Sequence, residues 1–192
     1  MDITGLVVAA MVAGACVFFV SFLIWMVSGI HDKDIKALPD EGAFMGDLAK
    51  HDIAPGLYMW PNCHDRKDMG SDGFKRRWKA GPWGTLNIQG NAPNFARNLI
   101  GSLVLNVLIA LGIAVAISMV LSGPSGKAAS VECLQCQVFW PAVILGCCAY
   151  CLSPICEALF MGKQTRFILT SLGDGLAFAL VTALLLTALW PA

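Results

Sequence analysis

The chain has 192 residues, of which 57% are hydrophobic and 14% are charged, and its 13 basic side chains balance its 13 acidic ones. A mean hydropathy of +0.67 is typical of a membrane protein. The sequence contains no P-loop, no dinucleotide-binding glycine run and no GxSxG nucleophile elbow. Composition therefore argues against a nucleic-acid-binding protein, and we predict no catalytic residue, metal site or cofactor.

Four apolar segments are long enough to cross a bilayer as helices. A helix rises about 1.5 Å per residue, so roughly 20 residues span a hydrocarbon core of about 30 Å. In lipid the backbone must satisfy its own hydrogen bonds, which favours helices. The sequence predicts an all-α membrane protein with transmembrane helices at about 5–30, 98–121, 138–160 and 167–190.

The predicted helices divide the chain into a first helix within 1–30, an insert at 31–97 and a three-helix region at 98–192. The first segment lacks a basic leader, and its apolar run exceeds the roughly 7 to 15 residues of a signal peptide. We therefore expect it to be a retained helix.

The insert is expected to form a small mixed α/β or irregular subdomain. Asp40 is placed to cap a helix that would end near Lys50. A short strand is predicted at 57–60, a second helix capped by Ser71 or Asp72 would run through residue 79, and a second strand would span 85–89.

The distribution of basic residues predicts the orientation in the membrane. Ten of the 13 Lys and Arg lie in 31–97, Lys163 and Arg166 lie in the last turn, and only Lys127 lies in the 122–137 loop. Because positive charge flanking membrane helices stays in the cytoplasm, we expect a cytoplasmic insert and both termini outside.

One basic and aromatic cluster stands out in the insert. Anionic headgroups attract basic side chains, and tryptophan prefers the membrane interface. We predict membrane-surface contact for this cluster, and the alternative is a solvated helix face with aromatic rings packed beneath it. Its members are Lys75, Arg76, Arg77, Trp78, Lys79 and Trp83.

Several short motifs carry a resemblance to a known family. They are LPDE at 38–41, PGLYMWP at 55–61, GPWGTL at 81–86 and LGDGLAFALVTALLLTALWP at 172–191. They resemble those of small bacterial inner-membrane proteins of about this length, which have one helix, an insert and three further helices, and no established activity. The resemblance covers nearly the whole chain. It implies an architecture and a bacterial inner-membrane setting, but no mechanism.

The cysteines depart from that family's pattern. Cys133 and Cys136 form a CxxC on the expected outer side, where disulfides persist, so a local disulfide is predicted; a metal or redox site is the alternative. Cys147, Cys148 and Cys151 share about one face of the third segment, which also contains Cys156. Close helix packing is the favoured explanation, with thiolate metal handling as the alternative.

Polar residues within the apolar segments are candidates for function, because intramembrane carboxylates are costly. The candidates are Asp174, Glu157 and Asn106. Asp174 either binds a proton or an ion, or makes an interhelical hydrogen bond or an ion pair with Lys163, Arg166 or Arg97. The histidines, His31 among them, are expected at the surface.

We expect a non-enzymatic accessory or assembly subunit of a larger membrane complex. Its partners would be the lipid bilayer and either another membrane protein or further copies of the chain. A small transporter or ion-conducting oligomer using Asp174 is one alternative, and a membrane thiol or metal handler is another. Small residues suited to close helix packing are Gly101, Gly112, Ala114, Gly146 and Ala149.

Overall fold

The computed structural model describes residues 2–63, 65–123 and 134–191. The chain forms two compact units. The first comprises residues 1–36 together with 95–192, and the second comprises residues 37–94. We call them the helical unit and the insert, and we treat each by itself.

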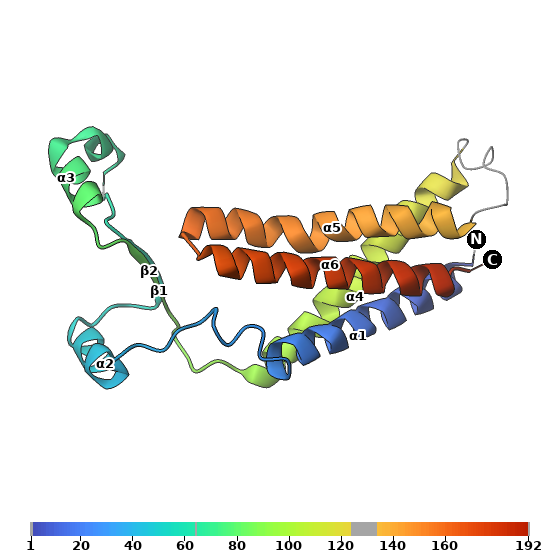
Figure 1. The fold of residues 1–192 in the computed structure, drawn as a ribbon, viewed down its shortest axis with the longest axis horizontal. Coiled ribbons are helices and arrows are strands. Elements are labelled where there is room, and N and C mark those ends of the chain that lie inside the picture. Colours follow the sequence, from blue (N-terminus) through green and yellow to red (C-terminus); the bar gives the residue numbers. More distant parts are fainter. Residues whose placement is uncertain (1, 64, 124–133, 192) are drawn as a thin grey trace. The chain divides into compact units, whose positions relative to one another are not determined.

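Four long helices build the helical unit (Figure 1): α1 (Ile3–Met26), α4 (Phe95–Ser122), α5 (Leu134–Met161) and α6 (Thr165–Ala188). All four are long and apolar enough to cross a membrane. The predicted helices are thereby confirmed at the level of length and composition. All four begin earlier than predicted, and α5 continues through Pro141 and Pro154.

The first helix ends four residues before its predicted end. It stops at Met26, and Ser28 Oγ donates a hydrogen bond to the carbonyl of Ile24 at 2.6 Å. Gly29 then adopts a φ of 68°, which a helix cannot include. The expectation that α1 reaches Ile30 is therefore wrong, because the backbone turns there despite the apolar composition.

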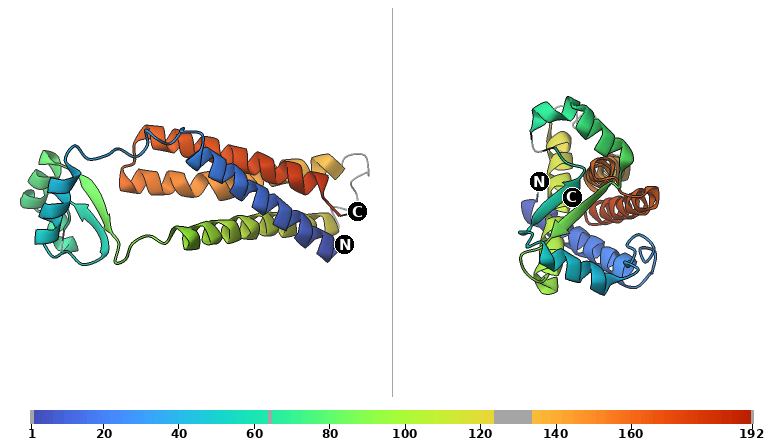
Figure 2. Two further views of the ribbon diagram at one scale, coloured as in Figure 1. Left: turned by 90° about the horizontal axis from the view of Figure 1, so that it is seen from below. Right: turned by 90° about the vertical axis from the view of Figure 1, so that its left-hand side faces the viewer.

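The four helices alternate in direction (Figure 2), and both ends of the chain lie at one end of the unit. The α5–α6 hairpin has the most extensive contacts, α1 pairs with α4, and α1 also packs on α6. Consequently the α1 end, the α4 start and the α5–α6 turn lie together at the opposite end, which we call the insert end.

Small residues let the helices approach closely. The shared core is rich in alanine, and Leu186 is among its largest fully buried side chains. At Gly14 an added Cβ would collide with the α4 backbone at Val107, and at Gly146 it would lie 2.9 Å from Ala179. Large apolar side chains face outward from all four helices, as expected for helices surrounded by lipid.

The small residues predicted for packing divide into two groups. Ala114 and Gly146 are buried between helices of this chain. Gly101, Gly112 and Ala149 face outward. The first group serves the fold of the helical unit.

The insert contains α2 (Glu41–Lys50), β1 (Gly56–Trp60), the 3-10 helix η1 (Arg66–Gly70), α3 (Asp72–Ala80) and β2 (Gly84–Ile88). The strands pair antiparallel, with Tyr58 opposite Leu86. The mixed α/β prediction is confirmed, and η1 is an element that it missed.

Both predicted helix caps are present in the insert. Asp40 accepts a hydrogen bond from the Ala43 amide at 2.9 Å, and Ser71 accepts one from the Phe74 amide at 3.2 Å. Of the two candidates for the second cap, Ser71 is therefore the N-cap and Asp72 is the first residue of the helix.

Replacing Gly14 with alanine should destabilise the helical unit. The added methyl group has no room against the α4 backbone, and overpacking typically costs about 1–3 kcal/mol. Gly112→Ala is the matched control, because nothing lies within 4 Å of its added Cβ. Unfolding of both variants in mild detergent measures the difference; equal stabilities would contradict the close α1–α4 contact.

Candidate functional site: a buried aspartate–histidine–aspartate cluster

The turn after α1 folds back onto the start of α6. The Asp32 amide bonds to the Gly29 carbonyl at 3.3 Å, and the Asp34 amide bonds to the His31 carbonyl at 2.9 Å. Two tight turns therefore follow one another within a few residues. They bring His31 and Asp34 against α6.

His31 lies between two carboxylates. Its Nδ1 is 2.7 Å from Asp34 Oδ2, and its Nε2 is 3.0 Å from Asp174 Oδ2. Only 6% of His31 and 8% of Asp174 is exposed, and the side chain of Asp34 is fully buried. Trp25 of α1 stacks on the imidazole, with 3.9 Å between ring centroids and 4° between planes.

Two further side chains of α6 hold Asp34. Thr170 Oγ1 donates to Asp34 Oδ2 at 2.7 Å, and Arg166 Nε forms an ion pair with Asp34 Oδ1 at 2.9 Å. Arg166 Nη2 also donates to the Ile30 carbonyl at 2.7 Å. The turn after α1 is therefore fastened to α6 at several atoms.

The surroundings of Asp34 favour its ionised form. The hydrogen bond from Thr170 is the largest influence and lowers the pKa of the Asp34 carboxyl. Burial raises this pKa, but the hydrogen bond with His31 and the charge of Arg166 lower it further. The net result is a pKa below the usual value of about 3.8.

Only one member of this cluster was predicted from the sequence. Asp174 was a candidate, whereas His31 was expected at the surface, and that expectation is wrong because the turn buries it. A usable signal was the spacing of Arg166, Thr170 and Asp174, since i, i+4 positions share one helix face. Nothing local to the sequence pairs that face with residues 31–34.

The other two polar candidates lie apart from this cluster. Glu157 is exposed and forms an ion pair with Lys163 at 2.7 Å. Asn106 is buried, and its amide group donates to the Ser102 carbonyl of its own helix at 2.9 Å. This hydrogen bond of Asn106 lies within α4 and joins it to neither acid.

The thiols of α5 differ in their exposure. Cys147, Cys148, Cys151 and Cys156 are all free. Cys151 is buried, and a Cβ added to Gly175 would lie 2.6 Å from its sulfur. Cys148 and Cys156 are exposed. Within the described residues, no group of three His, Cys, Asp or Glu side chains could hold a metal ion. Close packing therefore accounts for Cys151.

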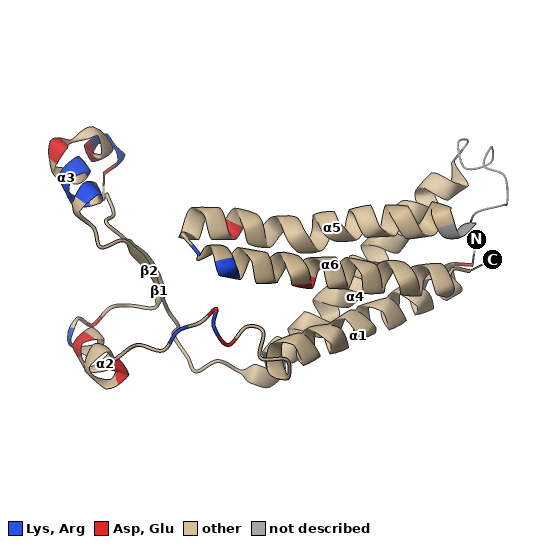
Figure 3. Ribbon diagram, in the orientation of Figure 1, with Lys and Arg blue, Asp and Glu red and all other residues tan. Residues whose placement is uncertain are grey.

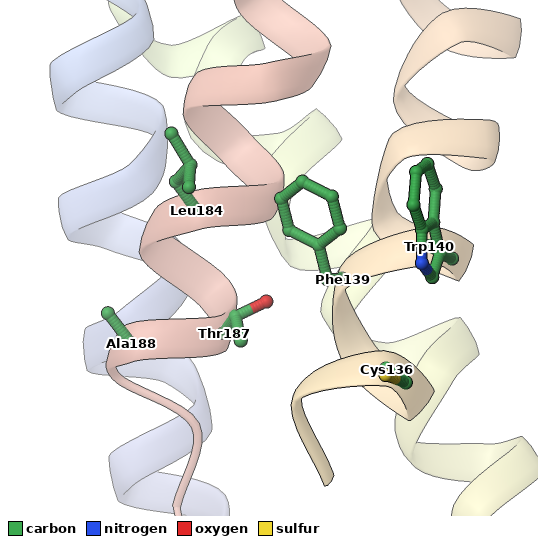
Figure 4. A pocket seen from close by; sticks show the side chains of 6 residues that line it. All are labelled: Cys136, Phe139, Trp140, Leu184, Thr187 and Ala188. Atoms are coloured by element: carbon green, nitrogen blue, oxygen red, sulfur yellow. The ribbon is translucent and has the colours of Figure 1, made fainter. Parts of the chain in front are cut away.

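The predicted Cys133–Cys136 disulfide lies outside the described residues, because Cys133 does. Cys136 borders an apolar pocket of about 430 Å³ between α5 and α6 (Figure 4). Phe139 and Thr187 also line this pocket, and the Thr187 hydroxyl already donates to the Ala183 carbonyl at 2.7 Å. The pocket offers packing space rather than reactive groups.

The basic and aromatic cluster lies on and just after α3 (Figure 3). Trp83 Nε1 donates to the Trp78 carbonyl at 2.7 Å, and the Arg77 guanidinium lies over the Phe74 ring at 5.9 Å. Trp78 and Trp83 are 50% and 61% exposed. These two rings are therefore largely exposed, and membrane-surface contact stays a prediction.

Comparison of the chain with protein-family models, curated proteins and solved structures finds no match. The described side chains and their contacts are thus the basis for assigning a role.

Replacing Asp34 with asparagine should remove part of the acid sensitivity of folding. A carboxyl whose folded pKa is lowered contributes stability above its usual pKa, and this contribution is lost as the pH falls through the lowered value. Asp34→Asn should be less stable than wild type at neutral pH and lose less on acidification. Thermal unfolding across the acidic range measures this.

Asp32→Asn is the matched control for that experiment, since Asp32 lies in the same turn and is exposed. It should follow the wild-type profile. Identical profiles for Asp34→Asn and wild type would contradict the role assigned to Asp34.

Proposed function

We propose that this chain is a multi-pass protein of the bacterial inner membrane and a non-enzymatic accessory or assembly subunit of a larger membrane complex. The four apolar helices and the resemblance to small inner-membrane proteins support the location. Both termini would lie outside and the insert in the cytoplasm.

The direction of the helices supports this orientation. Lys33, Lys36, Arg97, Lys163 and Arg166 all belong to the insert end of the helical unit. The alternation of the four helices therefore agrees with the charge distribution in the sequence.

The solvent exposure of the insert's residues is the observation that best supports the proposed role. None of its described residues is buried, although it contains five helices and strands. Leu57 is 61% exposed on one face of the two-stranded sheet, and Trp60 is 42% exposed on the other. A two-stranded sheet without a core is marginally stable alone, so another surface is needed to cover it.

The chemistry of the sheet favours a protein surface as that cover. Tyr58 and Trp60 lie on one face of the sheet, and their cross-strand partners on β2 are Leu86 and Gly84. A Cβ on Gly84 would collide with the Trp60 ring. Aromatic side chains of this kind are enriched in the centres of protein interfaces. The outer edge of β1 also has unpaired backbone groups that a partner can bond.

The charges of the insert would orient such a partner. Residues 37–53, around α2, carry four acidic and one basic side chain, whereas residues 65–80, around η1 and α3, carry six basic and three acidic ones. Figure 3 shows this segregation. The α3 side fits the anionic membrane surface, which leaves the sheet and α2 for the protein partner.

A second candidate function is proton or ion transport at Asp174, and its burial beside His31 favours it. Two other buried hydroxyls are engaged within their own helices. The hydroxyls of Ser118 and Thr182 donate to carbonyls of their own helices, at 2.7 and 2.8 Å. Reconstitution of Asp174→Asn tests transport, and a flux equal to that of wild type would remove this candidate.

A membrane protein should copurify with the wild-type chain from native membranes in mild detergent. Trp60→Ala should weaken its retention about tenfold or more, because central aromatic side chains carry most of an interface's binding free energy. Quantitative mass spectrometry of the eluates measures retention.

Trp140→Ala is the matched control, because Trp140 is an exposed tryptophan like Trp60 but lies on α5 rather than in the insert. It should retain the partner. A homogeneous chain without stoichiometric partner, or equal loss from both variants, would contradict the proposed function.

A further inference from the structure

A histidine with a carboxylate on each ring nitrogen is the most unusual polar arrangement among the described residues. A neutral imidazole has one N–H donor and one acceptor nitrogen. Two ionised carboxylates only accept hydrogen bonds. The contacts of His31 with Asp34 and Asp174 therefore cannot both be hydrogen bonds unless the three side chains hold an additional proton.

We propose that Asp34, His31 and Asp174 form a proton-binding site that fastens the junction between α1 and the insert to α6. The bound proton occupies one of two positions. Either both ring nitrogens carry hydrogen and donate to the two carboxylates, or Asp174 is protonated and donates to Nε2. Each state holds two protons, one more than a neutral imidazole with two carboxylates.

The summed charge of the cluster and its neighbours favours retention of this proton. Asp34 comes from the same turn, Asp174 and Arg166 come from α6, and the face of Trp25 comes from α1. With the proton bound, the positive and negative charges of these side chains cancel in either state. Without it the three buried side chains and the partly exposed Arg166 have a net charge of −1, which is costly where the three are shielded from water.

The remaining charged groups at the insert end pair elsewhere or lie on other helices. Glu157 of α5 pairs with Lys163 of the α5–α6 turn, and Arg97 lies in the first turn of α4. Asp32 and Lys33 of the junction are exposed. The proton-binding groups are thus Asp34, His31 and Asp174, with Arg166 as their compensating charge.

Loss of the proton should break the contact with Asp174 rather than the one with Asp34. Nδ1 lies closer to Asp34, at 2.7 Å against 3.0 Å for the Nε2 contact with Asp174. Asp34 also keeps its bonds to Thr170 and Arg166, which do not depend on the proton. Deprotonation releases one H⁺ and leaves the lone pair of Nε2 facing an ionised oxygen, so those two atoms repel.

The site therefore controls one of the attachments of the junction to α6. Asp34 holds the junction to α6 in both states, and His31 holds it only when the proton is bound. Residues 31–36 lead directly into the insert at Ala37. Protonation would thus decide how firmly the first residues before the insert are held.

Nitrogen NMR of the histidine rings tests the proton count on the full chain in lipid nanodiscs, labelled with ¹⁵N-histidine. Loss of signals in His31→Gln identifies the His31 ring. At neutral pH we expect either two protonated nitrogens, or one protonated nitrogen together with a carboxylic-acid infrared band that Asp174→Asn removes. A ring with one proton and no such band would overturn the proposal.

Hydrogen exchange of residues 31–36 tests whether the bound proton holds the junction to α6. This experiment does not require that the His31 variant folds. After correction for intrinsic rates, exchange in wild type should rise about tenfold from neutral to alkaline pH, the worth of one charge-assisted hydrogen bond. In Asp174→Asn, whose amide can donate to Nε2 without an added proton, exchange should lose this pH dependence, and Asp32→Asn should match wild type. A pH-independent wild type would overturn the proposal.

Discussion

The close contact between α5 and α6 at Gly175 is the constraint on which the candidate site depends. A Cβ at this glycine would lie 2.6 Å from the Cys151 sulfur and 3.1 Å from the Tyr150 backbone. Adjacent helical residues point about 100° apart, so a Gly175 turned toward α5 leaves Asp174 on a different face. That face meets α1 and the turn that follows it, where His31 lies. Packing between two helices therefore aims the carboxylate at a third element.

The composition of the cluster follows from where that carboxylate lies. An ionisable group in an apolar helix persists only when it is paired or hydrogen bonded. The turn after α1 brings a histidine, and it also brings a second acid, Asp34, that needs its own compensation. Arg166 and Thr170, which lie two turns and one turn before Asp174 on α6, supply it. The same face of α6 thus carries Asp174, which contacts His31, and Arg166, which pairs with Asp34.

Much of the fold could be predicted from the sequence, because its causes are local. Long apolar runs predict the four helices, and Asp40 and Ser71 predict the helix starts in the insert, since each caps an amide within three residues. The end of α1 could not be predicted from composition, because a glycine and a serine decide it within an apolar run. The burial of His31 could not be predicted either, because its partner Asp174 is 143 positions away in the sequence. Only the spacing on α6 gave a local indication of that site.

The helical unit and the insert differ in how much of their surface they bury by themselves, and this difference gives the junction between them its importance. The helical unit buries alanine and glycine inside and presents large apolar side chains outside, which suits a lipid surrounding. The insert buries none of its described residues, so under the proposed function its surface is completed by a partner. A surface completed from outside binds best when its point of attachment is already fixed, because each degree of freedom lost on binding reduces affinity. Residues 31–36 are one of the two connections between the units, and the bonds from Asp34 and His31 to α6 restrict this connection before any partner is present.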